Sequence, residues 1–115
     1  MNVKTMLAAA VLLVPLLARA EVDKKTERLW KSKCASCHGA DGKGKTDQGQ
    51  KMGIPDYTAA AWQKEFTDDQ IKKAINDGVQ REKDGKKQDM PGYKDSLQPD
   101  QVDALVKYIR SLKAG

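Results

Sequence analysis

The stretch KSKCASCHGADGKG, residues 31–44, contains both cysteines and the one histidine of this 115-residue chain. All three lie within the pentapeptide at residues 34–38, as Cys34, Cys37 and His38. The segment before it has apolar residues at helical spacing, and the glycine-rich segment after it predicts a loop. Two thiols and an imidazole therefore lie together where a helix ends.

The pattern C-x-x-C-H is typical of covalent haem attachment. Two thiols three residues apart at a helix end can form thioethers with the two vinyl groups of one porphyrin. The adjacent His38 can then bind the iron through its imidazole. We therefore expect one covalent haem c per chain, held by Cys34, Cys37 and His38.

Other kinds of site compete with this interpretation. An exported chain can oxidise a C-x-x-C pair, but thiol redox enzymes of that kind need a βαβ framework, which the sequence does not indicate. A zinc site needs four ligands, usually in two separated pairs, and here there is one cluster. A haem enzyme or gas sensor with a labile methionine ligand also stays open, as a peroxidase-like alternative.

The first twenty residues, MNVKTMLAAAVLLVPLLARA, have the layout of a secretory signal peptide. Lys4 makes the start positive, an apolar run follows, and cleavage is expected after Ala20. The apolar run is shorter than the roughly 20 residues that a membrane span requires. We predict export to the periplasm, no membrane span after cleavage, and one mature domain at residues 21–115.

The composition of the mature part indicates a missing apolar component. Lys4 and Arg19 leave with the signal, so 19 basic residues face 16 acidic ones and the net charge is +3. That excess is too small to indicate nucleic-acid binding. Leu, Ile, Val and Phe supply 13 of the 95 mature residues. So small a core requires a disulfide, a metal or a large apolar cofactor.

Helical periodicity predicts an all-α fold with three main helices. A short fourth helix is predicted at 59–66, with Thr58 as its cap. The main helices are expected at residues 23–35, 67–78 and 99–112. Thr67 and Gln70 form a capping box for the second, and Pro99 suits the first position of the third. No segment alternates like a strand, so residues 39–57 and 79–97 are expected to be long loops, which suggests that they wrap a ligand.

A second axial ligand for the iron must come from a methionine, because no second histidine exists. The mature chain has two, Met52 and Met90. Pro91 keeps Met90 out of a helix, and the 52 residues after His38 are long enough to cross the haem. This placement favours Met90, with Met52 as the alternative.

From Leu29 to Leu112 the sequence resembles a class I, monohaem c-type cytochrome of the small bacterial periplasmic kind. The matching segments are LWKSKCASCHGADGKG, MGIPDYT, MPGYKDSL and VDALVKYIRSL. The resemblance implies the cytochrome c fold, with three main helices and long loops around one covalent haem. It implies thioethers at Cys34 and Cys37, and His38 and Met90 as axial ligands. It also implies that the Pro55 carbonyl accepts a hydrogen bond from His38 Nδ1.

The resemblance further implies electron transfer as the function. With both axial positions taken, the iron has no place for a substrate, so we expect a carrier and not an enzyme. Its partners would be a protein electron donor and a protein acceptor, bound transiently, and the protein would be a monomer.

Overall fold

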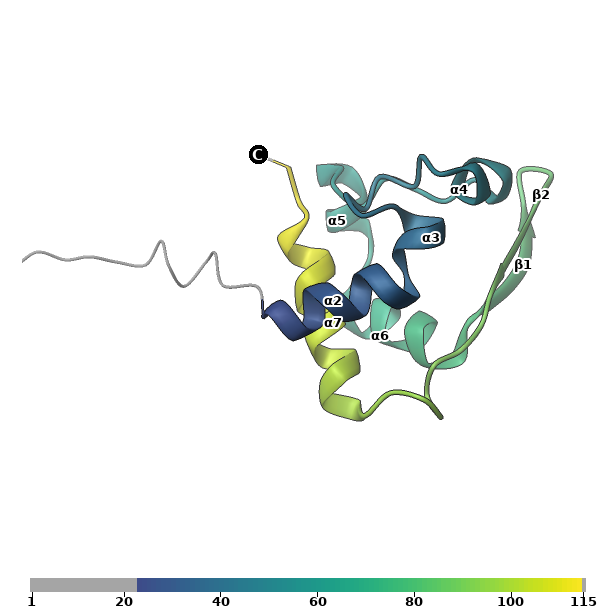
Figure 1. The fold of residues 1–115 in the computed structure, drawn as a ribbon. Helices are drawn as coiled ribbons and strands as arrows, with labels where there is room; N and C mark the ends of the chain where they lie inside the picture. The colour runs from purple at the N-terminus through teal and green to yellow at the C-terminus, as the bar shows by residue number, and fades with distance from the viewer. Residues whose placement is uncertain (1–22, 115) are drawn as a thin grey trace, which may run out of the picture.

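The computed structural model describes residues 23–114, and the predicted signal peptide lies outside them. Helices α2 (Lys24–Lys33), α6 (Asp68–Asp77) and α7 (Pro99–Ser111) form the main frame (Figure 1). Shorter helices connect them: α3 (Ala35–His38), α4 (Asp47–Met52) and α5 (Ala60–Glu65). Strands β1 (Val79–Lys83) and β2 (Lys86–Met90) pair antiparallel on the far side of the molecule from the start of α2 (Figure 1).

The three predicted main helices are confirmed. Asp23 caps α2, because its carboxylate accepts a hydrogen bond from the Lys25 amide at 3.1 Å. The predicted first helix continues past residue 35 as α3, after a break at Cys34. Thr67 and Gln70 form the predicted capping box of α6, with bonds of 3.1 and 2.8 Å. Each of these caps satisfies backbone N–H groups that the first helical turn leaves free.

The prediction of a loop at residues 39–57 was wrong for its middle, where α4 forms. Thr46 is the N-cap of this helix, and its hydroxyl accepts a hydrogen bond from the Gly49 amide at 2.9 Å. The predicted cap of the short helix α5 was also wrong. Ala59 stands at that position without a side-chain bond, because Thr58 instead bonds the carboxylate of Asp56.

The prediction of a loop at residues 79–97 was wrong for its first half, which forms a β-hairpin, residues 79–90. Its register pairs Val79 with Met90 and Lys83 with Lys86. The turn is Asp84–Gly85, with φ of 51° and 78° at the two residues. Positive φ at both positions is the geometry of a type I′ turn, which Asp-Gly strongly favours. The turn therefore drives pairing of strands that have little strand propensity of their own.

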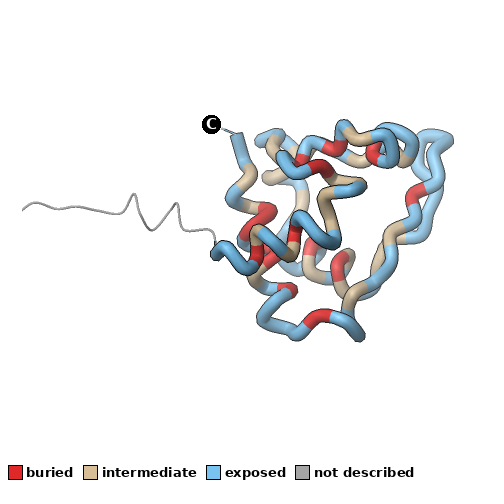
Figure 2. Tube along the Cα trace, in the orientation of Figure 1, coloured by how far each residue is buried: buried red, intermediate tan, exposed pale blue. Residues whose placement is uncertain are grey.

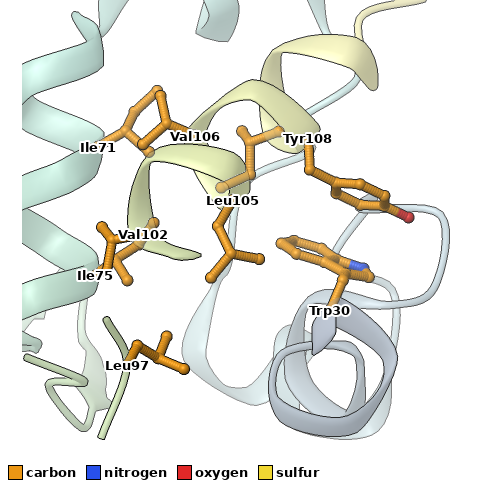
Figure 3. Close-up of a cluster of buried hydrophobic side chains, with 9 residues drawn as sticks. Trp30, Ile71, Ile75, Leu97, Val102, Leu105, Val106 and Tyr108 are labelled. Atoms are coloured by element: carbon orange, nitrogen blue, oxygen red, sulfur yellow. The ribbon is translucent and has the colours of Figure 1, made fainter. Parts of the chain in front are cut away.

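The apolar core lies where α2, α6 and α7 meet (Figure 3). Trp30, Val102 and Leu105 are 1–2% exposed. Tyr108 of α7 packs on Trp30 of α2 with ring centroids 5.2 Å apart. The hairpin, in contrast, is exposed along most of its length (Figure 2). Among residues 23–114, no helix is long and apolar enough to cross a bilayer.

Candidate haem site

The C-x-x-C-H motif begins at Cys34, between α2 and α3, and its remaining residues form α3. The Cys34 amide still donates to the Trp30 carbonyl at 2.8 Å, and the His38 amide donates to the Cys34 carbonyl at 2.9 Å. Gly39, with φ of 88°, then ends α3. Cys34, Cys37 and His38 all line the same cavity, so one helical turn presents both thiols and the imidazole to one space.

Two neighbouring groups hold this turn in place. Trp30 Nε1 donates a hydrogen bond of 2.9 Å to the Gly39 carbonyl. Thr46 donates its hydroxyl to the Cys37 carbonyl at 2.6 Å while it caps α4. Gly49 allows α4 to lie this close, because a Cβ there would overlap the Gly44 carbonyl and come within 2.8 Å of the Cys37 carbonyl oxygen. The motif is thus fixed by both the core and α4.

The cavity is bounded by the helical core on one side and by α4 and the hairpin on the other. Its volume of about 660 Å³ lies in the range of small-molecule and cofactor sites. Most of its surface is apolar. The core side contributes aliphatic and aromatic side chains, Phe66, Ile71, Ile75, Leu97, Leu105 and Ile109. A cavity of this size and lining suits a flat apolar ligand.

The surroundings of His38 keep its imidazole neutral. Burial lowers the pKa of His38 to about 4, because a charged ring loses its hydration there. The ring stacks on Tyr57 with centroids 5.1 Å apart and lies 5.6 Å from the Trp30 ring. A neutral imidazole is the form that binds a metal.

Nδ1 of His38 is buried and has no hydrogen-bond partner. The bond to the Pro55 carbonyl is therefore not formed in the structure, although Pro55 lines the same cavity. The Pro55 carbonyl faces Gly44, where a Cβ would come within 3.1 Å of its oxygen. A buried polar nitrogen without a partner is costly, and Pro55 stays its predicted hydrogen-bond acceptor.

The two cysteines do not form a disulfide with each other. Burial raises the pKa of Cys34 to about 11, with a smaller opposing effect from Lys33. Thiol redox enzymes need the opposite, a thiol whose pKa is lowered so that the reactive thiolate forms. The environment of Cys34 therefore does not suit thiol–disulfide exchange. No group of three or more Cys, His, Asp or Glu side chains placed to hold a metal occurs in residues 23–114.

Both candidate methionines line the cavity together with His38. Met52 is the last residue of α4, and Met90 is the last residue of β2, directly before Pro91. Met90 sits in the extended backbone that the following proline predicts. The cavity alone does not separate the two, so Met90 as ligand stays a prediction.

These residues fit a covalent haem. Two thiols on one helical turn can take both vinyl groups, a neutral buried imidazole follows directly, and apolar walls can cover a porphyrin. The orphaned Nδ1 adds a donor of the kind that ligating histidines use to fix their orientation.

Several residues of the site were missed from the sequence. Thr46 and Gly49 set the distance between α4 and the motif, and Gln88 and Arg81 line the cavity from the hairpin. Thr46 followed by Asp47 is a helix-start signal that could have revealed α4. Asp84–Gly85 could have revealed the hairpin. No sequence signal distinguishes Gln88 from the polar residues around it.

The chain as a whole is similar to known proteins. The family model described as Cytochrome c matches residues 24–113. The solved structure of a c-type cytochrome, KustC0563, is 32% identical, with a TM-score of 0.66 over 77% of this chain and 98% of that one. A Tyr-to-Phe mutant of Kustc0563 is 33% identical, with a TM-score of 0.63 over 76% and 98% of the two chains. No curated protein matches the chain.

Proposed function

The chain belongs to the cytochrome c family and has its fold and one covalent haem c, and from this premise we propose that it is an exported single-electron carrier with His38 and Met90 as axial ligands. When bound, haem c supplies a one-electron iron couple. The observation that carries the proposal is the meeting of Cys34, Cys37, His38 and Met90 at one apolar cavity.

The motif residues attach and orient the group. Cys34 and Cys37 would provide the thioethers from one helical turn, and His38 would bind the iron through Nε2, which leaves Nδ1 for a hydrogen bond. Pro55 is proposed as the acceptor for Nδ1, which would fix the ring and raise its basicity. Stacking on Tyr57, with centroids 5.1 Å apart, limits rotation of the imidazole.

Met90 is proposed as the second ligand because its strand brings it to the cavity in extended backbone. A thioether opposite an imidazole favours a high reduction potential. With both positions filled by the chain's own side chains, no site is left for a substrate. We therefore propose electron transfer without catalysis.

The carrier is proposed to act in the periplasm as a monomer. The signal-like residues 1–20 support export. Donor and acceptor proteins would bind transiently at the edge of the cavity, through a small interface typical of redox encounters.

The proposal is tested by the optical spectrum and redox titration of the purified ferric and ferrous holoprotein. We expect a low-spin ferric spectrum with a methionine–iron charge-transfer band in the near red. Met90→Ala should abolish that band, turn the iron high-spin and lower the potential, whereas Met52→Ala should keep all three. Loss of the band in Met52→Ala alone would assign the ligand to Met52. A high-spin spectrum of the unaltered protein would favour a peroxidase-like enzyme or a sensor.

A further inference from the structure

Gln88 is unlike the other residues of the hairpin. It is 8% exposed, whereas every other residue from Gln80 to Asp89 is exposed. A neutral amide in a charged, solvent-facing hairpin would normally point to water. Its burial requires that its donors and acceptor find partners in the protein.

The amide of Gln88 connects three segments. Its Nε2 donates to the Met52 carbonyl at 2.9 Å and to the Gly53 carbonyl at 3.3 Å. Its Oε1 accepts from Arg81 Nε at 2.7 Å. One side chain of β2 therefore bonds both β1 and the end of α4, and its polar atoms are satisfied.

The end of α4 is the natural place for such a bond, because the last carbonyls of a helix lack partners within it. Lys86 makes a second bond of this kind, from Nζ to the Gln50 carbonyl at 3.1 Å. Gln88 and Lys86 stand two residues apart on β2. Together they attach the hairpin to α4 by polar contacts, since the hairpin has no buried apolar side chain.

Gln88 is also two residues before Met90. Side chains at this spacing on a strand point to the same face, and both residues line the cavity. The position of β2 relative to α4 therefore also sets the position of the Met90 side chain relative to His38. A hairpin free to move away from α4 would take Met90 with it.

We propose that Gln88 is a positioning residue for the methionine ligand. Its amide fastens the hairpin to the carbonyl end of α4 and so keeps Met90 on the iron. This inference rests on the proposed function, because it requires Met90 to be the ligand. It adds that a contact between two protein segments sets the strength of the methionine–iron bond.

The test uses ferric holoprotein and imidazole, a small ligand that competes with the methionine for the iron. Gln88→Leu keeps a buried side chain of similar size but removes the bonds to α4. Losing the hydrogen bonds to the Met52 and Gly53 carbonyls should raise the apparent imidazole affinity about tenfold. Amide hydrogen exchange within residues 79–90 should accelerate in the same variant. Gln48→Leu, at an exposed glutamine of α4, is the matched control and should change neither quantity.

Lys86→Met provides a second variant whose folding is not in question, because Lys86 is exposed. Removing this more exposed bond should raise imidazole affinity about threefold, at the low end of hydrogen-bond contributions. Lys87→Met, the neighbouring exposed position on the same strand, should leave the affinity unchanged.

The outcomes separate this inference from the proposed function. If Met90→Ala keeps the charge-transfer band, Met90 is not the ligand and the proposed function fails. If Met90→Ala loses the band but Gln88→Leu and Lys86→Met bind imidazole like the unaltered protein, the positioning role is overturned. If Gln88→Leu changes affinity without faster exchange in the hairpin, Gln88 acts at the haem directly and the proposed attachment is also wrong.

Discussion

The helical core and the hairpin side of the cavity are held together by different forces. In the core, Trp30, Val102 and Leu105 are almost completely buried, and burial of apolar surface stabilises the crossing of α2 and α7. The hairpin contacts α4 through Gln88 and Lys86, by hydrogen bonds to carbonyls. The first region resembles the interior of an ordinary small domain. The stability of the second region depends on the group that fills the cavity between the helical core and the hairpin.

Because of this difference, the group that fills the cavity contributes much of the free energy that holds the helical core and the hairpin together. The core side of the cavity is apolar, and the hairpin side has no buried apolar residue to place against it. A covalent haem between them supplies the missing apolar surface. The low content of Leu, Ile, Val and Phe in residues 21–115 has the same explanation.

The largest expected effect follows from preventing attachment, in the double variant Cys34→Ser and Cys37→Ser. Without haem, the apolar walls of a cavity of about 660 Å³ would face water, and the burial that holds the two sides of the cavity together would be lost. A typical domain is stable by only about 5–15 kcal/mol, so a loss of this kind can abolish folding. We expect an exported protein without covalent haem and without a cooperative melting transition by circular dichroism.

The unaltered protein, expressed in the same host with the haem-attachment machinery, is the control, and a denaturing gel stained for covalent haem verifies the loss. A colourless variant that still melts cooperatively would show that α2, α6 and α7 fold on their own. The helical core would then be stable without haem, and the hairpin would be an addition that the core does not need for folding.

The next largest effect should come from the core. Trp30→Ala removes the side chain that packs on Tyr108 and donates to Gly39. We expect a loss of about 3–5 kcal/mol in the free energy of unfolding of the holoprotein, as for other buried Trp residues. Denaturant titration with haem absorbance as the signal measures it.

Glu82→Ala is the contrasting variant, at an exposed position of the hairpin. It should change the free energy of unfolding by no more than about 0.5 kcal/mol. Equal losses in the two variants would contradict the idea that apolar burial is concentrated in the core.

The same contrast explains what could be predicted from the sequence. The core helices follow from a 3.6-residue apolar period and from caps such as Thr67 with Gln70, which act locally. The motif at residues 34–38 needs its three residues on one turn, so spacing alone identifies it. Because the chain has no second histidine, the second axial ligand must be one of two methionines. Met90 is chosen because Pro91 keeps it out of a helix.

The hairpin could not be predicted in the same way, because its residues carry no alternation of apolar and polar side chains. Its pairing follows from Asp84–Gly85, a two-residue signal, and from bonds to α4 that lie 35 and 36 residues away along the chain. The role of Gln88 depends on that long-range contact. Helix α4 was missed for a related reason. It has only six residues, and its position is set by contacts of Thr46 and Gly49 with the motif and not by an apolar period of its own.

The smallest expected effect concerns Asp56, in the segment between Pro55 and Tyr57 that borders the cavity. Its carboxylate accepts bonds from the Thr58 hydroxyl at 2.6 Å and the Thr58 amide at 2.8 Å. The hydrogen bond from the Thr58 side chain holds the pKa of Asp56 below its usual range, with help from the Thr58 amide, Lys43 and Lys45. A carboxyl whose pKa is lower in the folded state stabilises it at neutral pH, and this contribution disappears as the pH falls.

Asp56→Asn should therefore lower the melting temperature slightly at pH 7, and the difference from the unaltered protein should shrink below about pH 4, where the carboxyl becomes protonated. The effect stays small because water still reaches this half-buried carboxylate and screens its charge. Thermal melts of the holoprotein at a series of pH values measure it, with Asp95→Asn, an exposed carboxylate distant from this turn in sequence, as the control. A difference that grows as the pH falls would mean that Asp56 opposes folding, and that this wall of the cavity is held by haem contacts and not by its own hydrogen bonds.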